Sequence, residues 1–335
     1  MLWTWNFMLD AFRSLGGVAD NFLQKSGPLG RGLFPIDPGK PIRLLVPENL
    51  LVPVSDVEFV DGRLKVKDAA RLGKGERMFF DNFQEAFSWG GEGRIYATAF
   101  IDALDALPID VRTLLATDFG MKPLLQQGLT GERAQQWFLN SRKINRNGIE
   151  VMMTLVELVN HGILGASFNL DRGVSVSGQF TDEILVRYNN TDPFDMFGSF
   201  GFPSPERICF SLPMRDPSDS RRLRIRRNIN LNAKLGSFPV PDFKLEDGML
   251  VLSSLMIGNA KFPRLSRGIF CRIINETGGQ NADETFDVIL HHNRSKLFKL
   301  LETLESHEGG LIPTLRKMVR YQLEAMSFCI GTREL

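Results

Sequence analysis

The residues of this chain that could do chemistry gather around positions 160 and 188. Asn160 and His161 stand next to each other, after the apolar run MMTLVELV and before a break at Gly162 and Gly165. A polar pair at such a boundary can present both side-chain and main-chain groups to a ligand. Taken alone, the pair is more typical of a helix end that asparagine caps.

The second candidate is a phenol. The chain has three tyrosines, and Tyr188 ends the apolar strand pattern EILVRY, directly before two asparagines. Taken alone, a tyrosine in this place is more often a core or edge aromatic than a catalyst.

Two further histidines and the cysteines favour structural interpretations. His291 and His292 are adjacent, so they point different ways on a helix, and a solvated helix face is favoured over a metal site. The cysteines Cys209, Cys271 and Cys329 are an odd, widely spaced set without a CxxC motif. This pattern predicts a reduced, cytoplasmic protein with no zinc site.

The composition limits the function classes. A length of 335 residues predicts two domains, or one domain with a large insertion. The net charge of +1, from 40 basic and 39 acidic side chains, gives no general reason to expect nucleic acid or an anionic membrane as a partner. The apolar N-terminus, residues 1–15, is too short to span a membrane. A docked amphipathic helix is expected there, with a peripheral membrane contact or a partner-binding helix as alternatives.

Periodicity predicts the order of the elements that must position these residues. Residues 1–24 are expected to be a helix, and residues 27–53 short strands with a turn at Asp37-Pro-Gly. Apolar residues at three- and four-residue spacing predict helices over residues 72–160. Short strands are expected again over residues 163–190.

The C-terminal part is expected to be mixed and then helical. RLRIRR at 222–227 alternates apolar and basic residues, which is typical of a half-buried strand, and a nucleic-acid patch is the less favoured interpretation. Residues 282–328 are expected to be helical. Strands and helices do not alternate in this order, so a nucleotide-binding parallel sheet is not expected. In addition, Gly30-Arg-Gly32 lacks the third glycine of a dinucleotide-binding loop.

Four segments carry a resemblance when they are taken in order. They are Leu29-Gly-Arg-Gly-Leu-Phe-Pro35 with the following LLVPENLLV, Asn140-Ser-Arg142, Glu157-Leu-Val-Asn-His161, and residues 184–202, which end in Phe200-Gly-Phe202. In this order, and with a helical insert after the first, they resemble the SET-domain methyltransferases. The most similar branch is that typified by the Rubisco large-subunit lysine methyltransferase, in which a helical insertion splits the SET domain.

The resemblance implies an α+β fold, with a SET-type arrangement of short β-strands, a helical insertion and a largely helical C-terminal domain. The implied parts are an N-terminal helix (1–24), the first part of the SET domain (25–71), the helical insertion (72–135), the second part of the SET domain (136–212) and a C-terminal substrate-side domain (213–335).

The resemblance also implies the cofactor, S-adenosyl-L-methionine, and the residues that hold it. The implied donor-binding residues are Leu29, Gly30, Arg31, Gly32, Arg142, Asn160, His161 and Tyr188. Main-chain groups of the glycine segment and the Arg142 guanidinium would hold the amino-acid end of the donor, and Asn160 and His161 the adenine side. Tyr188 would be catalytic, beside the sulfonium methyl group. Glu157, Phe168, Phe200 and Phe202 would contact the substrate.

The implied reaction is methylation of a lysine side chain of a protein, without nucleic acid, metal or a membrane span. Two departures from the family are visible. Phe200 stands where the family has a second tyrosine, and only residues 162–187 separate His161 from Tyr188. The alternatives are a SET-like binding protein that holds the donor or a protein tail without turnover, and a methyltransferase that acts on a small amine.

Overall fold

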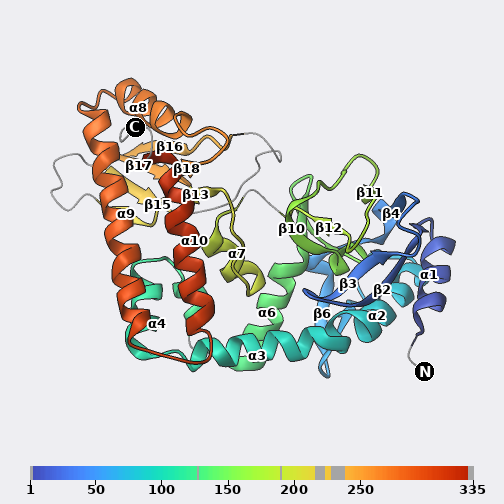
Figure 1. The fold of residues 1–335 in the computed structure, drawn as a ribbon. Helices are drawn as coiled ribbons and strands as arrows, with labels where there is room; N and C mark the ends of the chain where they lie inside the picture. The colour runs from blue at the N-terminus through green and yellow to red at the C-terminus, as the bar shows by residue number, and fades with distance from the viewer. Residues whose placement is uncertain (1–2, 127, 189–190, 216–222, 228–237, 331–335) are drawn as a thin grey trace. The chain divides into compact units, whose positions relative to one another are not determined.

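The computed structural model describes residues 3–126, 128–188, 191–215, 223–227 and 238–330. The chain forms two compact units (Figure 1): the first comprises Met1–Ile101 and Gly128–Tyr188, and the second Asp102–Gln127 and Asn189–Leu335. The α+β class expected from the sequence is confirmed, with short strands, a helical insertion and a largely helical C-terminal region.

The first unit is built from short strands and three main helices. Its helices are α1 (Trp5–Ser14), α2 (Lys74–Phe87) and α6 (Thr130–Arg142), and α3 (Arg94–Asp105) begins in it. Its strands are β1 (Val18–Asp20), β2 (Phe22–Gly27), β3 (Gly30–Pro35), β4 (Ile42–Val46), β5 (Leu51–Pro53), β6 (Val57–Val60), β7 (Arg63–Val66), β8 (Lys143–Arg146), β9 (Ile149–Met153), β10 (Asn160–Ala166), β11 (Val174–Gly178) and β12 (Leu185–Val186). They form small sheets: β1-β4-β11, β5-β9-β8, and the pairs β2-β3, β6-β7 and β10-β12.

The N-terminal helix is docked on the first unit, as expected, but it is shorter than the predicted 1–24. It buries Met8 and Phe12, and the Phe12 ring stacks on Phe79 of α2 at 5.7 Å between centroids. The helix ends at Ser14 because Gly16 takes a φ of +91°, a conformation that favours glycine. The chain then enters β1, which pairs with β4.

The helical prediction for the segment before Asn160 was also wrong. The run MMTLVELV was expected to be helical, but only Val156–Leu158 is helical, as a single turn of 3-10 helix. The first two residues of the run belong to β9 (Ile149–Met153), which pairs with β5 on one side and β8 on the other. Tertiary pairing of its branched and apolar side chains, three of them buried, overrides the helical spacing. Asn160 therefore begins a strand instead of ending a helix. The turn at Asp37 is confirmed by a 2.9 Å hydrogen bond from Gly39 N to Asp37 Oδ1.

The second unit combines a small mixed sheet with long helices. Its helices are α4 (Ile109–Thr117), α5 (Lys122–Leu125), α7 (Pro193–Phe200), α8 (Leu265–Glu276), α9 (Ala282–Glu305) and α10 (Ile312–Ile330). Its strands are β13 (Ile208–Phe210), β14 (Met214–Arg215), β15 (Leu223–Arg226), β16 (Asp242–Glu246), β17 (Met249–Ser253) and β18 (Met256–Asn259). Figure 1 shows α9 and α10 as two long helices side by side, which confirms the helical pattern of residues 282–328.

The expected helical insertion, 72–135, is shared between the two units. Its first helix, α2, packs on β7 and α1 in the first unit, while α4 packs on α9 in the second. In the second unit, Lys296 of α9 forms an ion pair with Asp118, which follows α4, at 2.9 Å between Nζ and Oδ2. None of the helices in the described ranges is both long and apolar enough to cross a membrane.

Prediction for the N-terminal helix: Phe12→Ala lowers the free energy of unfolding by about 3 kcal/mol or more, because it leaves a cavity against Phe79. Urea unfolding followed by circular dichroism measures this. Phe7→Ala on the same helix is the control, since Phe7 is 56% exposed, and it changes stability by about 0.5 kcal/mol. Equal effects of the two variants would show that the helix is not docked in solution.

Candidate functional site

Three segments that are distant in the sequence meet in the first unit. Ile184 N donates to the carbonyl of Leu33 in β3 at 2.8 Å, and Arg187 N donates to the carbonyl of Ala166 at 2.9 Å. β10 and β12 are parallel, with Asn160 opposite Leu185. The segment 183–188 is therefore joined through its backbone both to the β2–β3 hairpin and to β10.

The β2–β3 hairpin presents the predicted glycine segment at its tip. Gly27 pairs with Gly30, and the chain turns through Pro28 and Leu29. Leu29 is 56% exposed. Gly30 has a φ of +89°, which a residue with a side chain rarely adopts. The turn thus depends on glycine. It leaves Leu29 and Gly30 exposed at the tip of the hairpin, whereas Gly32 is buried within it.

Asn160 connects this hairpin with the segment 183–188. Its Nδ2 donates to the carbonyl oxygen of Arg31 at 3.0 Å and to Oε1 of Glu183 at 2.6 Å. The structure thus brings two of the predicted donor-binding residues together. It also adds Glu183, which the sequence interpretation missed because a carboxylate at the start of a strand pattern carries no motif of its own.

His161 and Tyr188, the other two central candidates, are in contact. Nδ1 of His161 accepts a hydrogen bond from the backbone N–H of Tyr188 at 3.3 Å, and the two ring centroids are 5.2 Å apart in an edge-to-face arrangement. An accepting Nδ1 assigns the proton of a neutral imidazole to Nε2. The imidazole therefore holds the backbone of Tyr188 in place.

The Tyr188 phenol is itself positioned by a hydrogen bond. Its O–H donates to the carbonyl of Val159 at 2.8 Å. Burial raises the pKa of Tyr188 to about 12; the positive charge of Arg142 opposes this, and the negative charges of Glu183 and Glu157 reinforce it. At neutral pH the phenol is protonated, and an oxygen that donates its proton in this way still offers lone pairs as acceptors.

Glu157 is a buried carboxyl beside this group, with 8% of its surface exposed. Ser88 Oγ donates to its Oε1, while its Oε2 is buried without a partner among the described residues. Burial raises its pKa to about 7, against the lowering effects of Arg142 and of polar contacts with Ser88 and Gln84. Sequence spacing could not reveal Ser88 or Gln84, because both lie far upstream at the end of α2.

The backbone just before Glu157 is strained. Leu155, fully buried, has φ 59° and ψ −51°, and Val156 N donates to the carbonyl of Thr154 at 2.7 Å. These values describe a γ-turn with positive φ at its centre, the rarer and strained form. Strain of this kind persists where the surrounding structure enforces it, and it is common at functional sites.

Arg142 contributes the positive charge of the region. It is the last residue of α6, and its guanidinium carbon lies 5.5 Å from the Phe138 ring centroid. Its charge lowers the pKa of Glu157 and Tyr188, although burial keeps both pKa values raised. Within the described ranges no carboxylate forms an ion pair with it, so its guanidinium can take an anionic group from a ligand.

The aromatic residues predicted to contact the substrate lie in different units. Phe168 belongs to the first unit and packs, partly buried, against its core. Phe200 and Phe202 belong to the second, with ring centroids 6.3 Å apart, and Gly201 between them ends α7 at a φ of +81°. Their assignment as channel walls stays a prediction.

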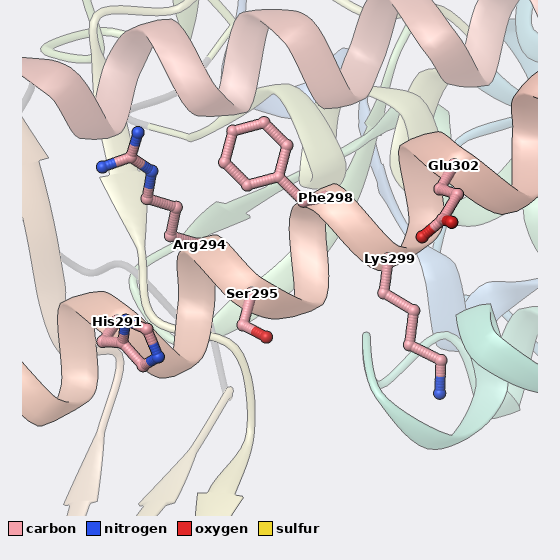
Figure 2. Close-up of a pocket in the computed structure, with 6 residues that line it drawn as sticks. All are labelled: His291, Arg294, Ser295, Phe298, Lys299 and Glu302. Atoms are coloured by element: carbon pink, nitrogen blue, oxygen red, sulfur yellow. The ribbon is translucent and has the colours of Figure 1, made fainter.

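A pocket on the second unit involves none of the predicted site residues. It is lined by His291, Arg294, Ser295, Phe298, Lys299 and Glu302, all on α9 (Figure 2). The Arg294 guanidinium carbon lies 5.5 Å from the Phe298 ring centroid. His291 is exposed on this face, in agreement with the expected helix surface, whereas His292 is partly buried. Among the described residues, no three His, Cys, Asp or Glu side chains are grouped so as to hold a metal ion.

Comparison with known proteins gave structural likenesses only. No family model and no curated protein matches the sequence. The chain is similar to a structure of Rubisco LSMT bound to AdoMet, with a TM-score of 0.41, and to the SET domain of LSMT bound to lysine and AdoHcy, with a TM-score of 0.39. Each shows 10% identity and covers 98% of this chain and 89% of the other. Likenesses at these TM-scores do not decide the function, which therefore depends on what the residues of the site can do.

Prediction for Glu157: Glu157→Gln raises the free energy of unfolding at pH 8 by up to about 3 kcal/mol and has little effect at pH 4. The carboxyl is protonated in the folded protein up to about pH 7 but ionises near pH 4.5 when unfolded. Wild-type stability is therefore lost as the pH rises from 4.5 to 7, and an uncharged side chain avoids this loss. Urea titrations from pH 4 to 8 measure it.

The control for this prediction is Glu58→Gln, at an exposed position in β6 of the same unit. It should leave the pH dependence of wild type unchanged. A stability difference between Glu157→Gln and wild type that is the same at every pH would contradict the buried, protonated carboxyl.

Proposed function

We propose that this chain is an S-adenosylmethionine-dependent methyltransferase that methylates a lysine side chain of a protein. The single observation that supports this most strongly is the arrangement in the first unit, where Asn160 and His161 connect the glycine hairpin with Tyr188 through the hydrogen bonds described above. Three of the four motifs that resemble the SET-domain methyltransferases thus contribute residues that hydrogen bonds join, and the charge of Arg142, from the fourth motif, acts on Tyr188 and Glu157.

The residues present fit the methyl donor, which carries a carboxylate, an ammonium group, an adenine and a positively charged sulfur. We call the residues that would hold it the donor site: Leu29, Gly30, Arg31, Gly32, Arg142, Asn160, His161 and Tyr188. Arg142 has no carboxylate partner in the described chain and suits the donor's carboxylate. Main-chain groups at the hairpin tip suit the ammonium group and the ribose, and the Asn160–His161 pair the adenine.

When bound, the donor would supply a methyl group on a sulfonium sulfur. A neutral lysine nitrogen would take this methyl group while the C–S electron pair remains on sulfur. The proton that the methylated nitrogen releases would pass to water. The chain's task is alignment, since an in-line displacement gains most from orientation. Tyr188 is the proposed catalytic residue. Its oxygen, fixed by the bond to Val159, can accept CH···O contacts from the methyl group.

The acceptor must lose a proton before it reacts, since the pKa of lysine in water is about 10.4. An apolar passage disfavours the ammonium form. The residues proposed to contact the substrate are Glu157 and Phe168 in the first unit and Phe200 and Phe202 in the second. The proposed partner is a protein with an exposed lysine.

Prediction for Tyr188: Tyr188→Phe slows methyl transfer by about 10²–10³, because it removes one oriented oxygen next to the reacting carbon. Radiolabelled S-adenosylmethionine incubated with the protein and a host lysate, followed by mass spectrometry of the products, measures the rate and identifies the acceptor. Tyr321→Phe in α10 is the matched control and should keep the wild-type rate. An unchanged rate in Tyr188→Phe would refute the role of the phenol.

The same assay separates the alternatives. Donor binding by calorimetry without any transfer would indicate a SET-like binding protein. Transfer into the small-molecule fraction of the lysate instead of its proteins would indicate a small-amine methyltransferase. No donor binding at all would refute the proposed function.

Prediction for Phe200: Phe200→Tyr changes the number of methyl groups added to the acceptor lysine, because it restores a hydroxyl that the resembling family has at this position. Mass spectrometry of the product from wild type and variant gives the distribution of mono-, di- and trimethyl-lysine. Identical product distributions for wild type and Phe200→Tyr would contradict this prediction. Phe202→Tyr controls for the addition of a hydroxyl to a neighbouring ring.

A further inference from the structure

The Glu183 carboxylate lies in a notch between two glycines of the β2–β3 hairpin. A Cβ on Gly32 would collide with its Oε1, and a Cβ on Gly27 would lie 3.4 Å from its Oε2. The same Oε1 accepts a hydrogen bond from Asn160 Nδ2 at 2.6 Å. The carboxylate can occupy this place only because residue 32 is glycine, and it contacts two residues of the donor site.

Glu183 can accept more hydrogen bonds than the chain supplies. A carboxylate offers about four lone-pair sites. Among the described residues, the Asn160 amide is its one donor, so Oε2 accepts no hydrogen bond, and Oε2 is not sealed from solvent. Lys25, on the same face of the hairpin as Gly32, has its Nζ over the Phe34 ring, 4.2 Å from the centroid, rather than on the carboxylate. Oε2 is therefore available to a hydrogen-bond donor of a ligand.

The carboxylate lies between the two groups of residues that make up the donor site. On one side it contacts Gly32 of the glycine segment, which is assigned to the amino-acid end of the donor, and on the other side Asn160, which is assigned to the adenine side. Ribose is the part of the donor that joins these two ends. The Glu183 and Asn160 side chains are both partly exposed, so a ligand can reach this place. Glu183 therefore lies where the ribose is expected.

Ribose carries two neighbouring hydroxyl groups, and a carboxylate can accept a hydrogen bond from each of them. Bonds of this kind are stronger than those between uncharged groups, and acidic side chains bind ribose in this way in dinucleotide-binding folds. We propose that Glu183 holds the ribose of the methyl donor by accepting hydrogen bonds from its two hydroxyl groups. This inference rests on the proposed function. It makes the donor site selective for a ribonucleoside over a deoxyribonucleoside.

Two other roles of Glu183 must be separated from this one. It could pair with the ammonium group of the donor, which is present with or without ribose hydroxyls. It could also serve only to fasten the hairpin to Asn160, in which case its removal affects every ligand alike. Under both of these roles the effect of changing Glu183 is independent of the ribose hydroxyls. Under the proposed role the two changes are coupled, and a double-mutant cycle measures that coupling.

The test is calorimetry with two ligands on wild type and Glu183→Gln. The ligands are S-adenosylhomocysteine and its dideoxy analogue, which lacks both ribose hydroxyls. Gln keeps the size of the side chain and an oxygen that accepts from Asn160, but it loses the charge. We expect wild type to bind the dideoxy analogue about thirtyfold more weakly than S-adenosylhomocysteine. Glu183→Gln should weaken S-adenosylhomocysteine about tenfold and the dideoxy analogue less than about twofold, so the preference for ribose falls to about threefold.

A matched control completes the design. Asp182→Asn removes the exposed neighbouring carboxylate and should leave both affinities unchanged. Thermal unfolding of each variant without ligand shows that the fold is retained. The comparison of the two ligands on wild type needs no variant, so it tests the proposal even where Glu183→Gln does not fold.

The outcomes are distinct. Equal affinity of wild type for the two ligands would overturn the role of Glu183 and leave the proposed function standing. An equal change in both affinities on Glu183→Gln would do the same, because it indicates an ammonium contact or a purely structural carboxylate. Failure of wild type to bind either ligand would overturn both the role of Glu183 and the proposed function.

Discussion

The two hydrogen bonds donated by the Asn160 amide are the interaction on which the rest of the site depends. The acceptors are the carbonyl oxygen of Arg31 in the β2–β3 hairpin and the carboxylate of Glu183. A single side chain therefore sets the spacing between three segments that are far apart in the sequence. An amide suits this position because it donates two hydrogen bonds in a fixed plane and carries no charge of its own. With the hairpin and the segment 183–188 held in this way, the imidazole of His161 meets the backbone of Tyr188.

Charge in this region is balanced only in part. Arg142 supplies one cation, and Glu157 and Glu183 supply two acidic groups, of which Glu157 is half-protonated only near pH 7. The Tyr188 phenol adds no negative charge at neutral pH, because burial raises its pKa to about 12.

The sequence predicted those parts of the fold that depend on local patterns. The strand at Val174–Gly178, the alternation of buried and exposed residues over Leu223–Arg226, and the helices α9 and α10 follow their apolar spacing. The pairing of β9 with two strands, which converts the run before Asn160 into strand and turn, was not predictable, since it depends on partners about a hundred residues upstream for β5. Ser88 beside Glu157 and Glu183 beside Asn160 were missed for the same reason: each belongs to a contact that only tertiary structure creates.

Local rules of protein structure fail together in the segments that form the candidate site. Leu155 is a buried residue in a strained turn. In the part of the chain that the structure describes, Glu157 leaves one carboxyl oxygen buried without a hydrogen-bond partner, and Glu183 forms no ion pair. Each departure lowers the stability of the fold by an amount that ordinary packing would avoid. Departures that gather in one place of an otherwise well-packed unit are expected where a ligand completes the structure, because its polar and charged groups supply the missing partners. The positions of these segments could not be predicted from their own sequence, because their geometry depends on contacts with distant parts of the chain, such as Ser88 with Glu157 and Glu183 with Asn160.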